Sequence, residues 1–283
     1  MDDILDDGHC PCLESDYEDA LRKLDVAVCE AQAVSQAINV EEAELHIGFS
    51  VQIFRKLCSH SVALICSVPR SRWVVSDFEN WDFVCIAAQG RAILEGYLLF
   101  LYLTKTPSCD AEWSARLLVL YINDCTRRAQ IMSQVKATDA AEDLRTQTEE
   151  LRDRIRRNPW FLSLDDKTRK RCLAGQHLMI SSRDEVLEDA GWDSDEFNAV
   201  WNLLSQYSHV LPMSFTRMEV GGRGSGSLNQ TDLDYMTATI SMCADTLHAA
   251  TNYMASAFAY TEVLRRGINS VFESGPKANR SLQ

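Results

Sequence analysis

A line of polar side chains runs along the helix that apolar spacing predicts over residues 194–211. At 100° per residue, its members fall within about 60° of one another. They are two amides, a hydroxyl and an imidazole: Asn198, Asn202, Ser205 and His209. Such a line can hold a phosphate or a water, or form hydrogen bonds to a buried partner. It can equally be a solvated polar face.

A charged pair stands in the most apolar stretch of the chain, residues 81–104. Arg91 and Glu95 are four residues apart, so on a helix they share a face. A helix that is apolar on all sides is normally buried, and each charge would then need the other. The sequence therefore predicts a buried ion pair. We expect the polar line on 194–211 to supply its neighbours, with His209 bonded to Glu95.

A basic region interrupts an otherwise acidic chain. Residues 152–171 hold eight Lys or Arg against three Asp, with aromatic residues between them. Basic side chains interleaved with aromatics suit single-stranded nucleic acid, because phosphates pair with the charges and bases stack on the rings. The candidate nucleic-acid-binding residues are Arg156, Arg157, Trp160, Lys167, Arg169, Lys170 and Arg171. The alternative is a solvated helix end and a loop anchored by buried aromatics, since charge runs usually serve solvation.

Two further motifs point to no ligand. His9, Cys10 and Cys12 offer only three ligands, whereas a structural zinc ion takes four. The glycines of residues 221–227 lack the preceding strand and the following Gly-Lys-Ser/Thr of a phosphate-binding loop. The sequence therefore predicts a loop there, and no metal or cofactor.

Composition favours long helices. Hydrophobic residues make up 46% of the 283 residues, and there are only 12 Gly and 6 Pro to break helices. The net charge of −13 argues against wholesale binding to nucleic acid or to an anionic membrane, since both would be repelled.

The ten cysteines show no disulfide spacing, so we expect a reducing compartment and a cytoplasmic protein. The acidic N-terminus has no secretory pattern. Residues 83–103 reach the length of a membrane span. However, Arg91 and Glu95 lie near the centre of that stretch, where charges are costly in lipid. We therefore predict no membrane partner.

The fold predicted is all-α: a single helical bundle of about six to eight helices around a long buried central helix, 81–104. Residues 1–15 are expected to form a disordered acidic tail, 16–270 the bundle domain and 271–283 a flexible tail. Within the bundle, 139–180 is predicted as an insertion, with a charged helix over 139–157 that projects into solvent and a basic loop. The remaining predicted helices cover 16–37, 41–68, 110–136, a short segment from 182 to 191, 194–211 and 231–266.

Three segments carry a resemblance to a family. GRAILEGYLLFLYLTKTP, SSRDEVLEDAGW and VWNLLSQYSHVLP resemble a widespread bacterial family of uncharacterised all-helical proteins, over roughly residues 45–260. In that family an Arg-x-x-x-Glu helix precedes an aromatic-x-x-Leu-Ser-x-x-x-His helix. The matching residues here are Arg91 and Glu95 on the first helix, then Trp201, Leu204, Ser205 and His209 on the second.

That family is similar to the HEPN helical bundles, many of which are metal-independent endoribonucleases in bacterial defence and toxin–antitoxin systems. The resemblance implies His209 as general acid or base, Arg91 as phosphate ligand, and Ser205 and Asn202 as orienting groups. In the HEPN signature, four to six residues separate an Arg from the His that follows it. Here Asn202 stands before His209, so Arg91 would replace that arginine.

Two hypotheses follow. The first is an HEPN-like, RNA-directed protein, a metal-independent ribonuclease of a bacterial defence or toxin system. Its partners would be RNA, a second copy in a homodimer, or an operon-encoded protein. The second is a non-catalytic interaction or ligand-binding module, in which Arg91, Glu95, Ser205 and His209 form a buried polar network that fixes helix register.

Overall fold

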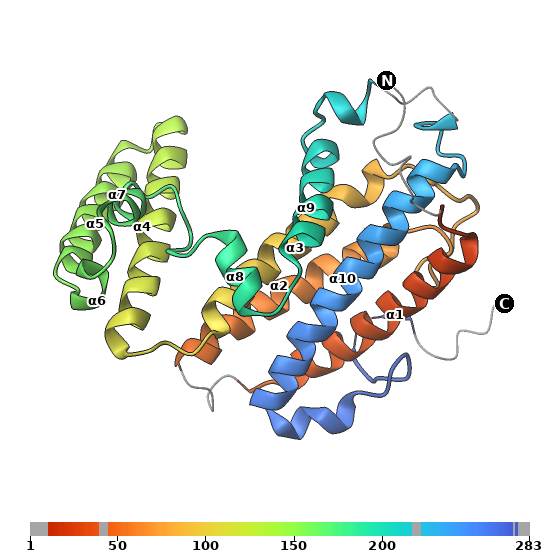
Figure 1. Ribbon diagram of the computed structural model, residues 1–283, viewed down its shortest axis with the longest axis horizontal. Coiled ribbons are helices and arrows are strands. Elements are labelled where there is room, and N and C mark those ends of the chain that lie inside the picture. The colour runs from red at the N-terminus through yellow and green to blue at the C-terminus, as the bar shows by residue number, and fades with distance from the viewer. Residues whose placement is uncertain (1–10, 40–44, 217–221, 274, 277–283) are drawn as a thin grey trace. The chain divides into compact units, whose positions relative to one another are not determined.

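The computed structural model describes residues 11–39, 45–216, 222–273 and 275–276 (Figure 1). All regular elements in these ranges are helices, which confirms the all-α prediction. The α-helices are α1 (Glu14–Ala37), α2 (Leu45–Ser67), α3 (Val84–Thr104), α4 (Asp110–Gln134), α5 (Thr138–Arg156), α6 (Pro159–Leu162), α7 (Asp166–Leu173), α8 (Arg183–Asp189), α9 (Ser194–Ser208) and α10 (Gln230–Ala257). Two 3-10 helices, η2 (Pro212–Ser214) and η4 (Ala259–Leu264), follow α9 and α10.

In the described ranges the helices outnumber the six to eight predicted because α6 and α7, of four and eight residues, lie in the stretch predicted as a basic loop. His9, Cys10, most of the predicted acidic tail and most of the predicted C-terminal tail lie outside the described residues.

The chain divides into two compact units. Unit 1 consists of residues 1–100 and 192–283, and unit 2 of residues 101–191. The predicted insertion, 139–180, lies inside unit 2. The 15 basic and 15 acidic residues of unit 2 balance, so unit 1 carries the whole net charge of −13.

In unit 1, α1 and α10 are the most closely packed pair of helices (Figure 1). The two run in the same direction: Cys12 N donates to Asp234 at 3.0 Å, and further along Lys23 Nζ donates to Asp245 at 2.8 Å. Small side chains on the facing sides allow this approach, among them Ala27 on α1.

Helix α3 contacts its neighbours in unit 1 through large rings. Phe83, just before the helix, meets Tyr207 of α9 and Tyr235 of α10, with ring centroids 4.9 and 5.4 Å apart. Near its other end, Phe100 meets Phe54 of α2 at 6.4 Å and Tyr253 of α10 at 5.6 Å. The helix thus lies among α2, α9 and α10.

By length and composition, α3 is the one described helix that could cross a membrane, and 44% of its most apolar window is buried in the structure. The core helix of a soluble protein passes the same test. The absence of a membrane partner and the cytoplasmic location stay predictions.

In unit 2, α5 packs along α4, so the prediction that it projects into solvent was wrong. Its buried residues follow spacings of three and four: Ala141, Leu144, Thr148, Leu151 and Ile155. Leu144, Leu151 and Ile155 of this narrow stripe join a core cluster that includes Val119 and Ile122 of α4. Most of the other residues of α5 are charged or polar, so the sequence does not reveal this apolar stripe.

Pro159 begins α6, where the missing N–H of proline costs nothing. The Asn158 side chain caps that helix by accepting from Phe161 N at 2.9 Å. The predicted basic loop is therefore partly helical, and Arg171 lies within α7. Ser182 and Glu185 form a capping box at the start of α8.

A buried ion pair does occur in unit 2, at Glu112 and Arg116 of α4. The two side chains are 11% and 4% exposed. Arg116 donates to Glu112 and to the carbonyl oxygens of Tyr102 at 3.1 Å and Lys105 at 2.7 Å. Glu112 also accepts from the Ser108 backbone N at 2.7 Å and its hydroxyl at 2.6 Å. This network joins the end of α3 and the loop that follows it to α4. It was not predicted from the sequence.

The Glu112 carboxyl makes a pH-dependent contribution to stability. Burial by itself would raise its pKa, but the hydrogen bonds from Ser108 and the Arg116 guanidinium outweigh burial, so the pKa lies below the usual glutamate value of about 4.5. A lowered folded-state pKa adds stability above the unfolded pKa, and that stability is lost as pH falls through the folded value. We expect the melting-temperature difference between wild type and Glu112→Gln to be constant above about pH 5.5 and to shrink as pH falls below 4.5. A difference independent of pH down to 3 would contradict this.

Candidate functional site

The candidate site lies where α9 crosses α3 in unit 1. Phe83 contacts Tyr207, and Tyr97 contacts Trp192, so the two helices are antiparallel. Helix α9 begins after Asp193, whose side chain accepts from the backbone N–H groups of Asp195 and Glu196. Its core face is formed by Phe197, Leu204 and Tyr207.

Gly90 allows the close approach of the helices. A Cβ atom at this position would lie 2.9 Å from Thr239 Cγ2 of α10 and 3.2 Å from Leu204 Cδ2 of α9. Any larger residue would push one of these helices away. The glycine therefore brings the next residue, Arg91, within reach of α9.

Arg91 spans the crossing and bonds to α9. Its Nη1 donates to the Trp201 carbonyl oxygen at 3.2 Å and to the Ser205 hydroxyl. The Ser205 hydroxyl in turn donates to the Trp201 carbonyl oxygen at 2.8 Å. The guanidinium carbon lies 3.3 Å from the centroid of the Trp201 ring, a cation–π contact. Arg91 therefore links α3 to both the backbone and the side chains of α9.

Glu95 completes the pair but lies outside the core. Arg91 Nη2 donates to Glu95 Oε1 at 2.6 Å, and the two side chains are 13% and 55% exposed. The prediction that both charges are buried was therefore wrong: the arginine is covered by Trp201, whereas the carboxylate faces solvent. An ion pair with an exposed carboxylate contributes little to stability, because water and salt screen the charge.

His209 does not join this network. Helix α9 ends at Ser208, His209 is the C-cap residue, and Val210 has a positive φ of 51°. The His209 backbone N donates to Ser205 O at 3.3 Å, while the residue is exposed. Within the described residues, the His209 imidazole has neither a hydrogen bond nor an ion pair, and Glu95 bonds to Arg91. Asn202 is also exposed.

The structure thus brings Arg91, Glu95 and Ser205 together and leaves Asn202 and His209 at the surface. The sequence places Trp201 only at the aromatic position of the family motif. The structure gives it the second role of covering the guanidinium. The four-residue spacing of Trp201 and Ser205 is the signal that could have indicated a shared arginine partner.

The predicted nucleic-acid-binding residues lie in unit 2, and the chain itself engages several of them. Arg156 bonds to Asp153 at 2.9 Å, and Arg169 bonds to Asp166 and to Leu162 O. Arg171 donates to Ile180 O, and Trp160 packs against the core cluster. The other three predicted residues, Arg157, Lys167 and Lys170, are exposed. Contact of these residues with RNA stays a prediction.

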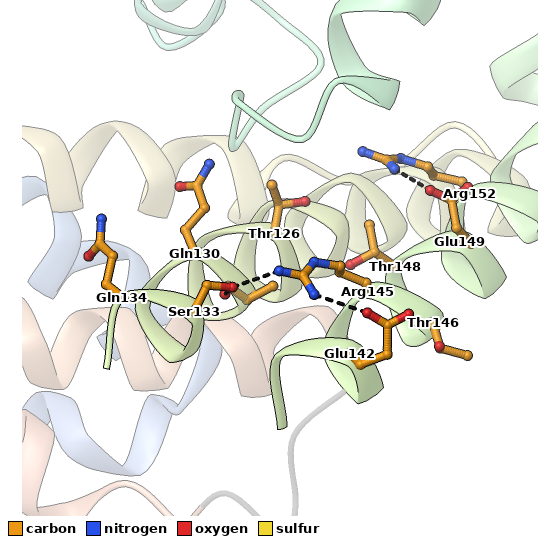
Figure 2. A pocket seen from close by; sticks show the side chains of 11 residues that line it. Thr126, Gln130, Ser133, Gln134, Glu142, Arg145, Thr146, Thr148, Glu149 and Arg152 are labelled. Carbon is orange, nitrogen blue, oxygen red and sulfur yellow. Dashed lines mark hydrogen bonds and ion pairs between the residues drawn. The ribbon is translucent and has the colours of Figure 1, made fainter. Parts of the chain in front are cut away.

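A polar groove of about 820 Å³ runs between α4 and α5 in unit 2 (Figure 2). Arg145 crosses it, donating to Ser133 Oγ at 2.7 Å and to Glu142 at 3.0 Å. Arg152, at one end, donates to Leu173 O at 2.9 Å and to Glu149. Both guanidiniums are therefore held by acceptors of the chain. In the described part of the chain, no group of three or more His, Cys, Asp or Glu could hold a metal ion.

Comparison with protein-family models, with curated proteins and with solved structures finds no match to this chain.

Proposed function

We propose that the chain is a non-catalytic interaction module built from helices, in which the Arg91 network fixes α9 against α3. The observation that carries the proposal is the engagement of the guanidinium. Both terminal nitrogens of Arg91 donate to the chain, and Trp201 covers one face of the group. The third nitrogen, Nε, is buried. A phosphate would have to displace these contacts before it reached the charge.

The candidate general acid or base also forms no hydrogen bond with this guanidinium, whose described partners are Trp201, Ser205 and Glu95. Cleavage of a phosphodiester needs a proton-transferring group and a cation at the same phosphate. His209 is exposed beyond the end of α9, whereas Arg91 is covered beneath Trp201. This separation favours a structural role for Arg91 over a catalytic one.

The second candidate is the HEPN-like, RNA-directed ribonuclease that the family resemblance implies. One observation favours it: His209 is open to solvent and one helical turn from Ser205, so an RNA strand could reach the imidazole. On this alternative, a second copy of the chain or RNA itself would have to bring a cation to His209.

Incubation of the purified protein with total RNA separates the two. A non-catalytic module is expected to leave the RNA intact, and wild type, His209→Ala and Asn202→Ala are expected to behave alike. Cleavage by wild type that is lost in His209→Ala, at an unchanged melting temperature, would establish the ribonuclease and overturn the proposal. Cleavage that persists equally in all three proteins identifies a contaminating nuclease.

A further inference from the structure

The connection between α2 and α3 presents apolar side chains to solvent. In this loop, Val75 is 88% exposed and Phe78 is 74% exposed, with Val74 beside them at 44%. The loop itself is held in place, because Trp73 Nε1 donates to Asp25 at 2.7 Å and Arg70 bonds to residues of α1. A large aromatic ring fixed in water is a feature of interaction sites, since folding alone gains nothing from it.

Carboxylates lie within this loop and against its first residues. Arg70 pairs with Glu14 at 2.8 Å, Glu18 at 3.5 Å and Glu79 at 3.1 Å, so one positive charge faces three negative ones. Asp77 adds a fourth within the loop. We call this the acidic loop surface, formed by Val74, Val75, Asp77, Phe78 and Glu79 together with Glu14 and Glu18. Its chemistry fits a partner that offers an apolar side chain flanked by cations.

Unit 2 carries such a surface. Leu162, at the end of α6, is 50% exposed, and Arg169 Nη1 donates to its carbonyl oxygen at 3.2 Å, which places α7 beside it. On α7, Lys167 and Lys170 are exposed and three residues apart, so they share a side of the helix. Among the described residues, neither lysine has an acidic partner. We call Leu162, Lys167 and Lys170 the basic surface.

We propose that the acidic loop surface of one copy binds the basic surface of a second copy. The two are complementary in both respects, apolar side chain to apolar side chain and carboxylate to ammonium. The copies repel each other through their net charge, but charges farther apart than about 8 Å are largely screened at physiological salt. The close pairs of carboxylates and lysines between the two surfaces therefore determine whether the copies bind. This inference rests on the proposed function and names its partner.

A second copy suits the basic surface better than RNA does. Trp160 packs against the core of unit 2, so its ring is not free to stack on a base. The exposed Leu162 gains from burial against an apolar side chain and gains nothing beside a phosphodiester.

The contact is head-to-tail, which gives it a distinctive test. Each copy in a pair keeps one unused surface of each kind, so wild type is expected to form higher assemblies or rings as concentration rises. A variant that lacks one surface cannot associate with itself. Two variants that lack different surfaces can form a single contact, and the assembly then stops at two chains.

Sedimentation velocity of four full-length proteins, wild type and three variants, tests this. The variants are Val75→Asp/Phe78→Asp, which alters the acidic loop surface, and Lys167→Glu/Lys170→Glu, which alters the basic surface. All the substituted positions are exposed, so the melting temperatures should stay close to wild type. Val135→Asp, at an exposed position outside both surfaces, is the matched control.

We expect wild type and Val135→Asp to associate with increasing concentration, and to do so less at about 0.5 M than at about 0.05 M salt. Each double variant alone is expected to sediment as a monomer, with association weakened at least about tenfold. An equimolar mixture of the two is expected to form a dimer.

A wild type that remains monomeric, or a mixture that does, would overturn the proposal. So would binding of a poly(U) probe that Lys167→Glu/Lys170→Glu abolishes, because the basic surface would then serve RNA. None of these results changes the outcome of the RNA cleavage test, so the two proposals fail separately.

Discussion

Replacing Arg116 by alanine is expected to lower the free energy of unfolding by about 3–5 kcal/mol, the loss typical when one member of a buried ion pair is removed. The substitution leaves the Glu112 carboxylate inside unit 2 with only its Ser108 hydrogen bonds. It also removes the donors that satisfy the carbonyl oxygens of Tyr102 and Lys105. Urea denaturation followed by circular dichroism measures the effect.

The matched control is Arg128→Ala on the same helix. Arg128 pairs with Asp124 at the same four-residue spacing, but the two side chains are 56% and 54% exposed. We expect that substitution to cost less than about 0.5 kcal/mol, because an exposed pair is screened. Equal losses at the two positions would show that burial does not govern the contribution of the pair.

Arg91→Ala is expected to cost about 2–3 kcal/mol, since it removes a largely desolvated cation–π contact and hydrogen bonds from a charged donor. Glu95→Ala removes the exposed partner of the same ion pair and is expected to cost less than about 1 kcal/mol. His209→Ala, at an exposed residue, should stay within about 0.5 kcal/mol of wild type. Chemical denaturation of the three variants under one set of conditions checks this order.

The order is informative because the polar network predicted from the sequence gives a different one. If Arg91, Glu95 and His209 together formed a buried network, each substitution would leave buried polar groups unpaired, and the three losses would be similar. If His209→Ala lowered the free energy of unfolding as much as Arg91→Ala, the predicted network would be supported. The exposed position of His209 in the structure would then be contradicted.

The long helices could be predicted because their apolar residues recur at three and four positions over many turns. Helix α5 shows where this fails. Its buried stripe holds one residue per turn, and the charged residues around it indicated solvent, although Leu144, Leu151 and Ile155 pack on α4. The short helices α6 and α7 lack the length that a periodic pattern needs, and only their capping residues, Asn158 and Asp165, signal them.

The two arginine–glutamate pairs show why the site was only partly predictable. Both pairs have the same four-residue spacing. The apolar residues around Arg91 and Glu95 predicted that this pair is buried, but the buried pair is Glu112 and Arg116. Burial depends on which helix covers each face, and this is a property of tertiary packing. Likewise, the alignment of His209 with Ser205 assumed a helix to residue 211, whereas α9 ends at Ser208 and the chain turns at Val210.

The central claim is that Arg91 acts by fastening α9 to α3, and a double-mutant cycle between Arg91 and Trp201 tests it most directly. The cycle compares Arg91→Ala, Trp201→Leu and the double variant by chemical denaturation. The 3.3 Å contact between the guanidinium and the ring predicts a coupling free energy of about 1–2 kcal/mol. A coupling indistinguishable from zero would mean that the two residues contribute independently, and the structural role assigned to Arg91 would be wrong.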